Sequence, residues 1–587
     1  MSELEHPQPQ FRRKNWQSLD GQWRFMFDDQ NLGTEKNWAS GLPKDAQTII
    51  VPYAYETEQS GIHDEVSHRY VWYQREIEYQ KDRKLTSTIL NFGGIDYIST
   101  IYLNNEQVGT HQGGYTRFAF DITKYLHEGS NQLVIKVEDN NDTTQPRGKQ
   151  RWRKENYECW YVQTTGIWKS VWLEKIPGNQ RISNFKVTPS MDLKTIDIEL
   201  ETKTSAVNNY LANEVRAVIR YQGQVINSVQ SPLTSTGCQF EMSVEQRDEP
   251  FPWSIKAWTP EQPNLYDLEL TLINKVEIED QVQTYFGMRR IDIKGQEILL
   301  SGHRLYQKLV LHQNYWPKSG LTPTGISEIT NDIHLIKAMG YNGIRLHQSI
   351  ADPRLLFLAD KLGLLVWSEM AATYQFNNRA MSNYSQEWTD IVKQNYNHPA
   401  IITWVPFNES WGIGSVETDE KQQSFVNSIY YLTKAYDNMR PVITNDGWEH
   451  TISDILTLHD YELSGEKFLA RYQDFTKLTS DDYQPNNDRF AFANHYHYQG
   501  QPILVTEFGG ISFKQDHGWG YGMQAESEVD FFKRFATIHQ AIKKIPFIQG
   551  YCYTQLTDVQ QETNGLLTID RKPKVSIQRV KEINDQD

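Results

Sequence analysis

The sequence predicts a multidomain protein in which an N-terminal β jelly-roll sandwich and an immunoglobulin-like β-sandwich precede a C-terminal (β/α)8 TIM barrel. Three observations support this prediction. The chain has 587 residues, which is too long for one ordinary core. Short alternating strands without long helical periods fill its first half. Apolar strands then alternate with helical patterns, as they do in repeated βα units. We expect the three domains at residues 1–177, 178–287 and 288–587.

The first predicted domain contains alternating apolar runs at 86–91, 99–103 and 132–137, separated by turn residues. This pattern is typical of a jelly roll. The segment 145–163 breaks the pattern because it is basic, aromatic and longer than a hairpin loop needs. Long loops of this kind are often functional. We therefore expect this loop to wall one side of a site in another domain.

The second predicted domain has alternating runs at 196–200, 215–221 and 268–272. Its length suits an immunoglobulin-like sandwich. Nothing in it indicates chemistry, so we expect it to act as a spacer.

The third predicted domain is the barrel. Apolar residues spaced by three and four predict a first helix that ends at Gly340. We expect eight parallel strands, a number that matches a closed barrel. Their predicted ranges are 305–311, 343–346, 364–367, 401–407, 442–444, 455–458, 503–505 and 548–551.

Composition excludes several functions. The net charge of −15 argues against nucleic acid or an anionic membrane as the main partner. No apolar stretch is long enough to span a membrane. The first ten residues lack the apolar core of a signal peptide, and the 3 cysteines offer neither a metal spacing nor a disulfide framework. We expect a cytoplasmic protein, and the sequence leaves homo-oligomerisation open.

Polar side chains follow every predicted barrel strand. In a TIM barrel these positions surround the mouth of the active site. Their convergence predicts a site for a polar, polyhydroxylated ligand such as an oligosaccharide or glycoside. The residues are His312, Arg345, His347, Glu369, Asn408, Glu409, Asp446, Trp448, Glu449, His459, Asp460, Tyr461, Glu507, Tyr553 and Gln555.

Two of these residues, Glu409 and Glu507, stand at the polar ends of buried apolar runs. A single glutamate at such a position more often caps a helix or joins a salt bridge. Asn408 beside Glu409 can bind a sugar hydroxyl, and Gly509 and Gly510 allow close backbone approach after Glu507. Two facing carboxyls supply the acid and the nucleophile of glycoside hydrolysis.

Histidines on the predicted rim raise the alternative of a metal-dependent hydrolase. No His-x-x-x-His helix spacing or cysteine cluster accompanies them. Neutral histidine also serves as a hydrogen-bond donor to sugars. We therefore expect neither a metal ion nor a cofactor.

The motifs N-H-P-A-I-I-T-W-V-P-F-N-E-S-W-G at 397–412 and T-E-F-G-G at 506–510 resemble the signatures of glycoside hydrolase family 2. The stretches at 16–25, 93–97, 109–118 and 165–174 resemble the sugar-binding domain of that family. The resemblance covers essentially the whole chain. It implies hydrolysis with retention of anomeric configuration, with Glu409 as acid/base and Glu507 as nucleophile. It also implies that Arg345 favours the charge of Glu507 and that Tyr461 lies beside it.

The sugar is less defined than the mechanism. We expect a β-galactosidase-like enzyme, the family default, with a β-mannosidase, β-glucuronidase or arabinosidase as alternatives. The Asn-x-Lys pair by which β-glucuronidases hold a uronic carboxylate is absent after strand eight, where T-N-G-L-L stands. An alternative of another class is a non-catalytic carbohydrate-binding protein. The residues predicted to bind substrate are Arg345, His347, Glu369, Asn408, Trp411, Asp446, Trp448, Glu449, His459, Tyr461 and Tyr553.

Overall fold

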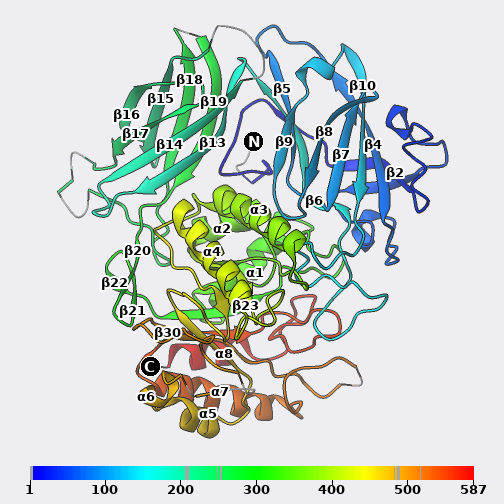
Figure 1. Cartoon of the computed structure of the whole chain (residues 1–587). Coiled ribbons are helices and arrows are strands. Elements are labelled where there is room, and N and C mark those ends of the chain that lie inside the picture. Colours follow the sequence, from blue (N-terminus) through cyan, green and yellow to red (C-terminus); the bar gives the residue numbers. More distant parts are fainter. Residues whose placement is uncertain are drawn as a thin grey trace.

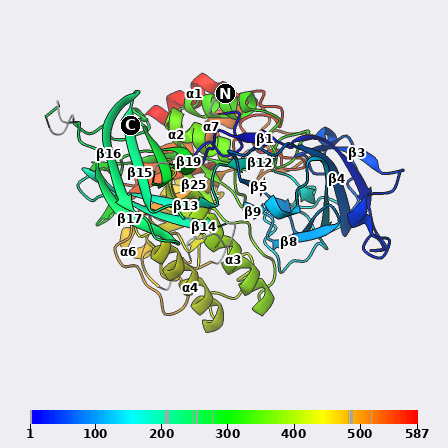
Figure 2. The same ribbon diagram turned by 90° about the horizontal axis from the view of Figure 1, so that it is seen from above.

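The structure is a computed structural model that describes residues 4–204, 211–246, 249–250, 254–275, 277–481, 483–484, 489–515 and 517–586. Figure 1 shows two β-sandwiches lying side by side, with the barrel below both of them. The view from above in Figure 2 separates the same two sandwiches. The predicted fold class is confirmed. The described helices of the chain contain none that is both long and apolar enough to cross a membrane.

The N-terminal sandwich packs a four-stranded sheet, ordered β1-β12-β5-β9, against a six-stranded sheet, ordered β3-β2-β4-β10-β7-β8. A two-stranded ribbon joins β11 to β6. Buried side chains between the sheets form one apolar core. The strands are β1 (Trp16–Ser18), β2 (Gly21–Phe27), β3 (Gln47–Val51), β4 (Tyr70–Tyr79), β5 (Ser87–Phe92), β6 (Ile95–Asp96), β7 (Ile98–Leu103), β8 (Glu106–Gln112), β9 (Phe118–Asp121), β10 (Gly129–Glu138), β11 (Gly166–Ile167) and β12 (Val171–Ile176). Short 3-10 turns occupy Trp38–Ser40, Glu58–Ser60 and Thr123–Tyr125.

The middle sandwich packs the sheet β13-β14-β17 against the sheet β16-β15-β18-β19. Alternate residues of each strand point into its separate core. The strands are β13 (Gln180–Pro189), β14 (Thr195–Thr204), β15 (Glu214–Tyr221), β16 (Gln224–Pro232), β17 (Gly237–Ser243), β18 (Tyr266–Asn274) and β19 (Glu277–Phe286). A small antiparallel meander of β20 (Ile291–Lys294), β21 (Glu297–Leu300) and β22 (His303–Arg304) leads into the barrel.

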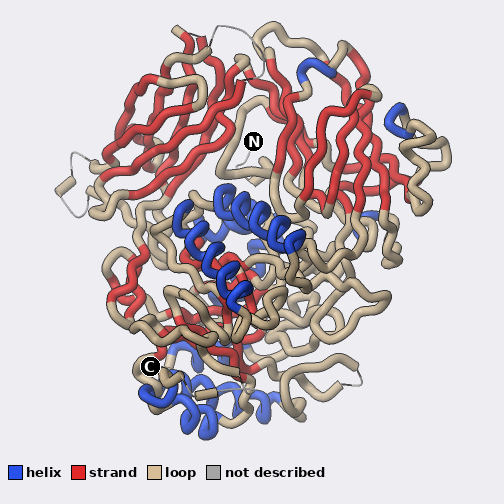
Figure 3. Tube along the Cα trace, viewed as in Figure 1, coloured by secondary structure: helices blue, strands red, loops and turns tan. Residues whose placement is uncertain are grey.

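Most of the described helices belong to the third domain, as the colouring in Figure 3 shows. Its seven-stranded parallel sheet has the order β26-β25-β24-β23-β31-β30-β29. The strands are β23 (Gln307–His312), β24 (Gly343–Leu346), β25 (Leu365–Glu369), β26 (Ile401–Val405), β27 (Phe407–Asn408), β28 (Asn445–Asp446), β29 (Leu456–Asp460), β30 (Ile503–Gly509) and β31 (Ile548–Thr554). The helices are α1 (Ile326–Ala338), α2 (Pro353–Leu362), α3 (Asn378–Asn395), α4 (Glu420–Tyr436), α5 (Gly465–Tyr472), α6 (Phe475–Leu478), α7 (Glu528–Lys544) and α8 (Ile577–Asp585).

The fourth and fifth barrel positions differ from the predicted pattern. Pro406, which has no backbone N–H, separates β26 from β27, so the predicted strand 401–407 is interrupted. The predicted strand 442–444 is instead the two-residue β28, which pairs with β27. No helix lies between β28 and β29 in the described residues 447–455, so the βα repeat is incomplete at this point.

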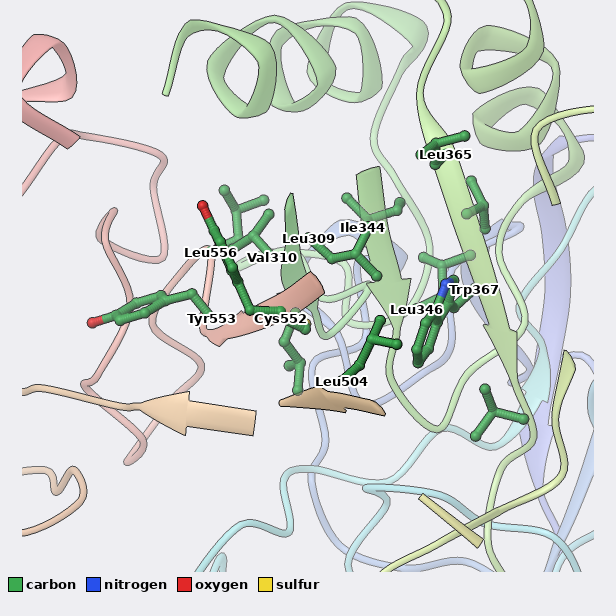
Figure 4. Close-up of a cluster of buried hydrophobic side chains, with 14 of the residues drawn as sticks. Leu309, Val310, Ile344, Leu346, Leu365, Trp367, Leu504, Cys552, Tyr553 and Leu556 are labelled. Carbon is green, nitrogen blue, oxygen red and sulfur yellow. The ribbon is translucent and has the colours of Figure 1, made fainter. Parts of the chain in front are cut away.

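Local sequence explains the regular parts of the barrel. Helix α2 begins with Pro353 after the cap Asp352, whose side chain accepts a hydrogen bond from the Arg354 amide. It ends at Gly363, whose left-handed backbone (φ 70°) suits a helix C-cap. The strands are buried throughout, as expected for a parallel sheet covered by helices. Figure 4 shows some of the apolar side chains that fill this region.

Buried polar contacts join the three domains. The Arg13 guanidinium binds Glu174 of the first sandwich at 2.5 Å and Asp280 of the second at 2.8 Å. The amide of Tyr115 donates a hydrogen bond to Glu387 on α3 at 2.6 Å. Loss of one partner from a buried pair of this kind is costly, so these contacts fix the sandwiches relative to the barrel.

Candidate functional site

Arg345 at the end of β24 is the centre of the candidate site. Its fully buried guanidinium contacts three carboxylates: Glu369 at 2.8 Å, Asp446 at 2.9 Å and Glu507 at 2.8 Å. It also donates to the Asn408 side-chain oxygen at 2.6 Å. Four of the residues predicted from strand ends therefore meet at the Arg345 cation, because the carboxyl ends of barrel strands converge.

Glu507 lies within strand β30 (Ile503–Gly509), whereas the sequence predicted it just after the strand. Burial would raise its pKa, but the positive charges of His459 and Arg345 outweigh burial and lower the pKa to about 2. The Tyr461 hydroxyl donates a hydrogen bond to the other carboxylate oxygen. Glu507 is therefore ionised at neutral pH, as a carboxylate nucleophile must be.

Glu409 lies across the mouth from Glu507 and is the more accessible of the two, with 19 % of its side chain exposed against 5 % for Glu507. Ligand oxygens of the two carboxyls and a ring nitrogen of His459 all lie within 4.8 Å of one another. Retaining glycosidases hold their carboxyls roughly 5–5.5 Å apart, and inverting enzymes about 6.5–9.5 Å apart. An approach of at most 4.8 Å between oxygens of the two carboxyls favours the retaining arrangement over the wider inverting one.

The turn that presents Glu409 is strained and well supported. Glu409 and Ser410 both have left-handed backbones, with φ of 51° and 59°. The Glu409 amide donates to the Asp446 carbonyl at 2.9 Å, and the Ser410 hydroxyl donates to Glu449 at 2.6 Å. Arg489 in turn binds Glu449 at 2.6 Å. Glu449, predicted to contact substrate, thus supports the turn that carries Glu409.

His459 lies between the two carboxyls. Its Nδ1 is 2.8 Å from Glu409 and 3.7 Å from Glu507, and its Nε2 is 3.2 Å from Asp446. Burial lowers the pKa of the imidazole, but the Glu507 and Asp446 carboxylates outweigh burial and raise it to about 10. His459 therefore carries a proton next to Glu409 at neutral pH. Its Nδ1–H is placed to donate a hydrogen bond to Glu409 and so to orient that carboxyl.

Replacing His459 with asparagine is expected to lower kcat/KM by about 10²-fold, because the Glu409 carboxyl, the expected acid/base, loses the contact that orients it. It should also change the pH dependence of stability. A pKa raised from 6.5 to about 10 stabilises the fold fully below pH 6.5, and this stabilisation is lost as the pH rises through about 10. The melting temperature of the wild type should therefore fall more between pH 6.5 and 10 than that of His459→Asn. Equal falls in calorimetry would contradict a protonated His459.

His347 and Glu369 form a second pair beside Arg345. Burial lowers the pKa of His347 well below its usual value, with further lowering by Lys149 and Arg345. Burial raises the pKa of Glu369 to about 8 despite the Arg345 guanidinium. The Arg345 guanidinium lies 3.3 Å from His347 Nδ1 and can donate to it, and Glu369 Oε2 lies 3.3 Å from the same nitrogen. The other ring nitrogen then carries the hydrogen and can donate to a ligand.

Glu409, His459 and Glu507 are also the described residues whose ligand atoms could hold a metal ion. An imidazolium has no free lone pair for a metal, so a cation would have to displace the His459 proton. The site as arranged is the ionised Glu507 carboxylate and the Glu409 carboxyl on either side of a protonated His459.

Tyr553, predicted to bind substrate, lies elsewhere. Its ring packs against Phe535 and His539 of α7, and Figure 4 shows it directed away from Leu504 and Cys552. Successive strand residues point to opposite faces, and the next residue, Thr554, accepts a hydrogen bond from Tyr461 at 3.3 Å. The prediction that Tyr553 faces the site was wrong, because its neighbour Thr554 faces the site instead. His312, which also follows a predicted strand, does not join the site. It pairs with Asp332 on α1 at 3.3 Å instead.

An aromatic cluster next to Glu409 was only partly foreseen. Trp411, a predicted site residue, lies 5.2 Å from Trp160 and 5.7 Å from Tyr374 between ring centres. Trp152 lies 4.3 Å from Tyr374. Trp152 and Trp160 belong to the loop 145–163, so this loop of the first sandwich does reach the barrel mouth. Its basic and aromatic composition was the available signal.

Two more residues close the site. The Tyr521 ring stacks on Tyr461 at 3.3 Å and 4°. Trp448, a predicted site residue, meets the His459 ring edge-on at 5.7 Å. Tyr521 was not predicted, although an aromatic residue between Gly520 and Gly522 after β30 was a possible signal.

A TIM barrel with paired carboxyls at its mouth and two β-sandwiches before it defines a class of glycoside hydrolases. Family models described as Glycosyl hydrolases family 2 match the whole organisation. The sugar binding domain model matches residues 16–177, the central model residues 180–289 and the TIM barrel domain model residues 291–586. The chain belongs to glycoside hydrolase family 2.

Two relatives and one solved structure show which proteins of this family the chain is similar to. A putative beta-glucuronidase of Formosa agariphila is 26% identical over 83% of this chain and 57% of its own length. A beta-galactosidase of Thermoanaerobacter pseudethanolicus is 24% identical over 78% of this chain and 58% of its own. The chain thus matches less than two thirds of the length of either relative. A β-glucuronidase from Ruminococcus gnavus, solved with D-glucuronic acid, has a TM-score of 0.78 at 18% identity, with 98% of each chain covered.

Proposed function

We propose that this protein is a retaining exo-glycosidase that removes a terminal uronic acid by double displacement. The closeness of Glu409 to Glu507 and the lowered pKa of Glu507 carry the mechanistic part of this proposal. The relative named as a putative beta-glucuronidase and the β-glucuronidase of similar fold support a uronic acid as the sugar that is removed. They favour the glucuronidase alternative over the β-galactosidase expectation from the sequence.

In the first step the Glu507 carboxylate attacks the anomeric carbon, and the bond from that carbon to the leaving oxygen breaks. The leaving oxygen takes a proton from Glu409, whose carboxyl is held in place by its 2.8 Å contact with His459. Asn408 holds its oxygen toward Arg345, while its buried amide nitrogen has no partner among the described residues. This nitrogen is placed to donate to a hydroxyl of the reacting sugar.

In the second step water attacks the anomeric carbon and the ester to Glu507 breaks. Glu409, now ionised, takes a proton from that water. The greater exposure of Glu409 suits this role, because water must reach it. Once Glu507 is esterified, its negative charge no longer faces Glu409, which favours the base form of Glu409.

A neutral β-galactoside is the second candidate substrate, because one relative is named a beta-galactosidase. A panel of 4-nitrophenyl glycosides separates the two. It comprises β-glucuronide, β-galacturonide, β-galactoside, β-mannoside, β-glucoside and α-L-arabinoside. We expect a uronide to give the highest kcat/KM, and NMR to show the β-anomer as the first-formed uronic acid. A highest kcat/KM for a neutral glycoside would overturn the sugar class. The α-anomer forming first would overturn the mechanism.

A further inference from the structure

Lys149 belongs to the first sandwich but lies against the barrel. The amides of Arg147 and Gly148 donate to the Ala372 carbonyl at 2.8 and 3.1 Å. Gly148 has a φ of 59°, and a Cβ at this residue would lie 2.2 Å from the Gln348 carbonyl oxygen. Only glycine permits this approach. The backbone on the N-terminal side of Lys149 is therefore seated directly on the barrel loop that follows β24.

A small cavity lies between this loop and the barrel. It has room for about one water molecule (≈ 10 Å³). Lys149, Arg147 and His347 are among its lining residues, and none of the residues that line it is Asp or Glu. His347 also contacts Arg345 at 3.3 Å, so the cavity borders the site that holds Glu507. Arg147 pairs with Asp139 at 3.4 Å, and the His347 imidazole is neutral. Lys149 is therefore the lining cation that could receive an anion there.

Three buried donors that line the same cavity have no partner among the described residues. They are the amide nitrogen of Gln348, the hydroxyl of Ser349 and Nε of Arg147, all on residues at most 2% exposed. The side-chain oxygen of Gln313 is an acceptor there, likewise without a described partner. Gln348 also has a left-handed backbone with φ of 46°. Strain together with unpaired polar atoms is typical of ligand sites. The Lys149 ammonium lies beside the Cys159 thiol, and no described carboxylate lies within 4.0 Å of it.

We propose that Lys149 and Gln348 bind the carboxylate of the terminal uronic acid, one of whose oxygens occupies the cavity. This inference rests on the proposed function and names the residues that select the sugar class. The ammonium pairs with the carboxylate charge, and the Gln348 amide donates to one of its oxygens. A neutral sugar offers a hydroxyl group instead, which forms no charge pair with the ammonium. The first sandwich would thus supply the specificity of the barrel.

The charge of Lys149 is maintained within the site. Burial would lower its pKa, but the surrounding groups, Cys159 and Tyr374 first and then Glu562 and Glu507, raise it above the usual lysine value. Lys149 therefore stays cationic across the pH range in which a uronic acid is ionised.

Lys149→Met tests the inference, with Lys154→Met as the matched control, because Lys154 is an exposed cation of the same loop. The ratio of kcat/KM for 4-nitrophenyl β-glucuronide to that for the β-glucoside should fall by about 10²–10³-fold in Lys149→Met. The same ratio for the β-galacturonide and β-galactoside pair should fall likewise. Lys154→Met should keep the wild-type ratios, and Lys149→Arg should recover part of the loss.

The possible outcomes separate the two proposals. One outcome is that the wild type hydrolyses uronides while Lys149→Met lowers kcat/KM equally for the uronide and the neutral glycoside of a pair. Lys149 then supports Glu507 or the fold of its loop, so the inference fails while the proposed function stands. If the wild type hydrolyses only neutral glycosides, the proposed sugar class fails and the inference fails with it. Gln348→Leu gives a second test. The ratio of kcat/KM for the uronide to that for the neutral glycoside should fall in this variant too, although His347 and Lys149 are unchanged.

Discussion

Glu507→Gln is expected to lower kcat on every hydrolysed glycoside by on the order of 10⁵-fold, the scale of loss when a nucleophile is removed. The amide is nearly isosteric with the carboxylate but cannot attack the anomeric carbon. Steady-state kinetics with the best 4-nitrophenyl glycoside measure the loss. Calorimetry and circular dichroism establish that the variant is folded.

Glu466→Gln is a suitable control, because Glu466 is an exposed glutamate on α5. It should keep wild-type kcat. A Glu507→Gln variant with more than about one tenth of the wild-type kcat would show that another group attacks the sugar.

The second large effect is expected from Glu409→Ala. Loss of the proton donor should lower kcat by about 10²–10⁴-fold, and most for substrates with poor leaving groups. Azide should restore turnover of an activated aryl glycoside and form the β-glycosyl azide. The His459 imidazolium lies 2.8 Å from the present Glu409 oxygen and would attract the anion into the vacated space.

The stereochemistry of the azide product checks the assignment of the two carboxyls. A β-azide means that azide attacked a glycosyl ester from the side on which Glu409 stood. An α-azide from Glu409→Ala would mean that azide had replaced the nucleophile, and the roles of Glu409 and Glu507 would then be exchanged.

The sequence was sufficient to predict the three-domain fold and most of the site, because barrel strand ends converge whatever their separation along the chain. Arg345, Asn408, Asp446, His459 and Glu507 were found in this way. Glu449 was found too, but its role as support for the Ser410 turn depends on a side-chain contact that strand order does not specify.

The errors have physical causes. Tyr553 and Thr554 are neighbours on β31, and only the register of the strand decides which one points inward. The predicted position of strand five was wrong because just two residues, Asn445 and Asp446, pair with β27. Lys149 could not be assigned to the site from sequence, since its approach depends on how the first sandwich docks on Ala372 and Gln348.

Covalent capture of the glycosyl-enzyme tests the double displacement most directly. The reagent is a 2-deoxy-2-fluoro-β-glycosyl fluoride of whichever sugar the panel identifies, because the 2-fluoro group slows hydrolysis of the ester. Peptide mass spectrometry should find one fluorosugar per chain, attached to Glu507 in the peptide that contains β30. Attachment to another carboxyl, or inactivation without a covalent adduct, would contradict Glu507 as the nucleophile.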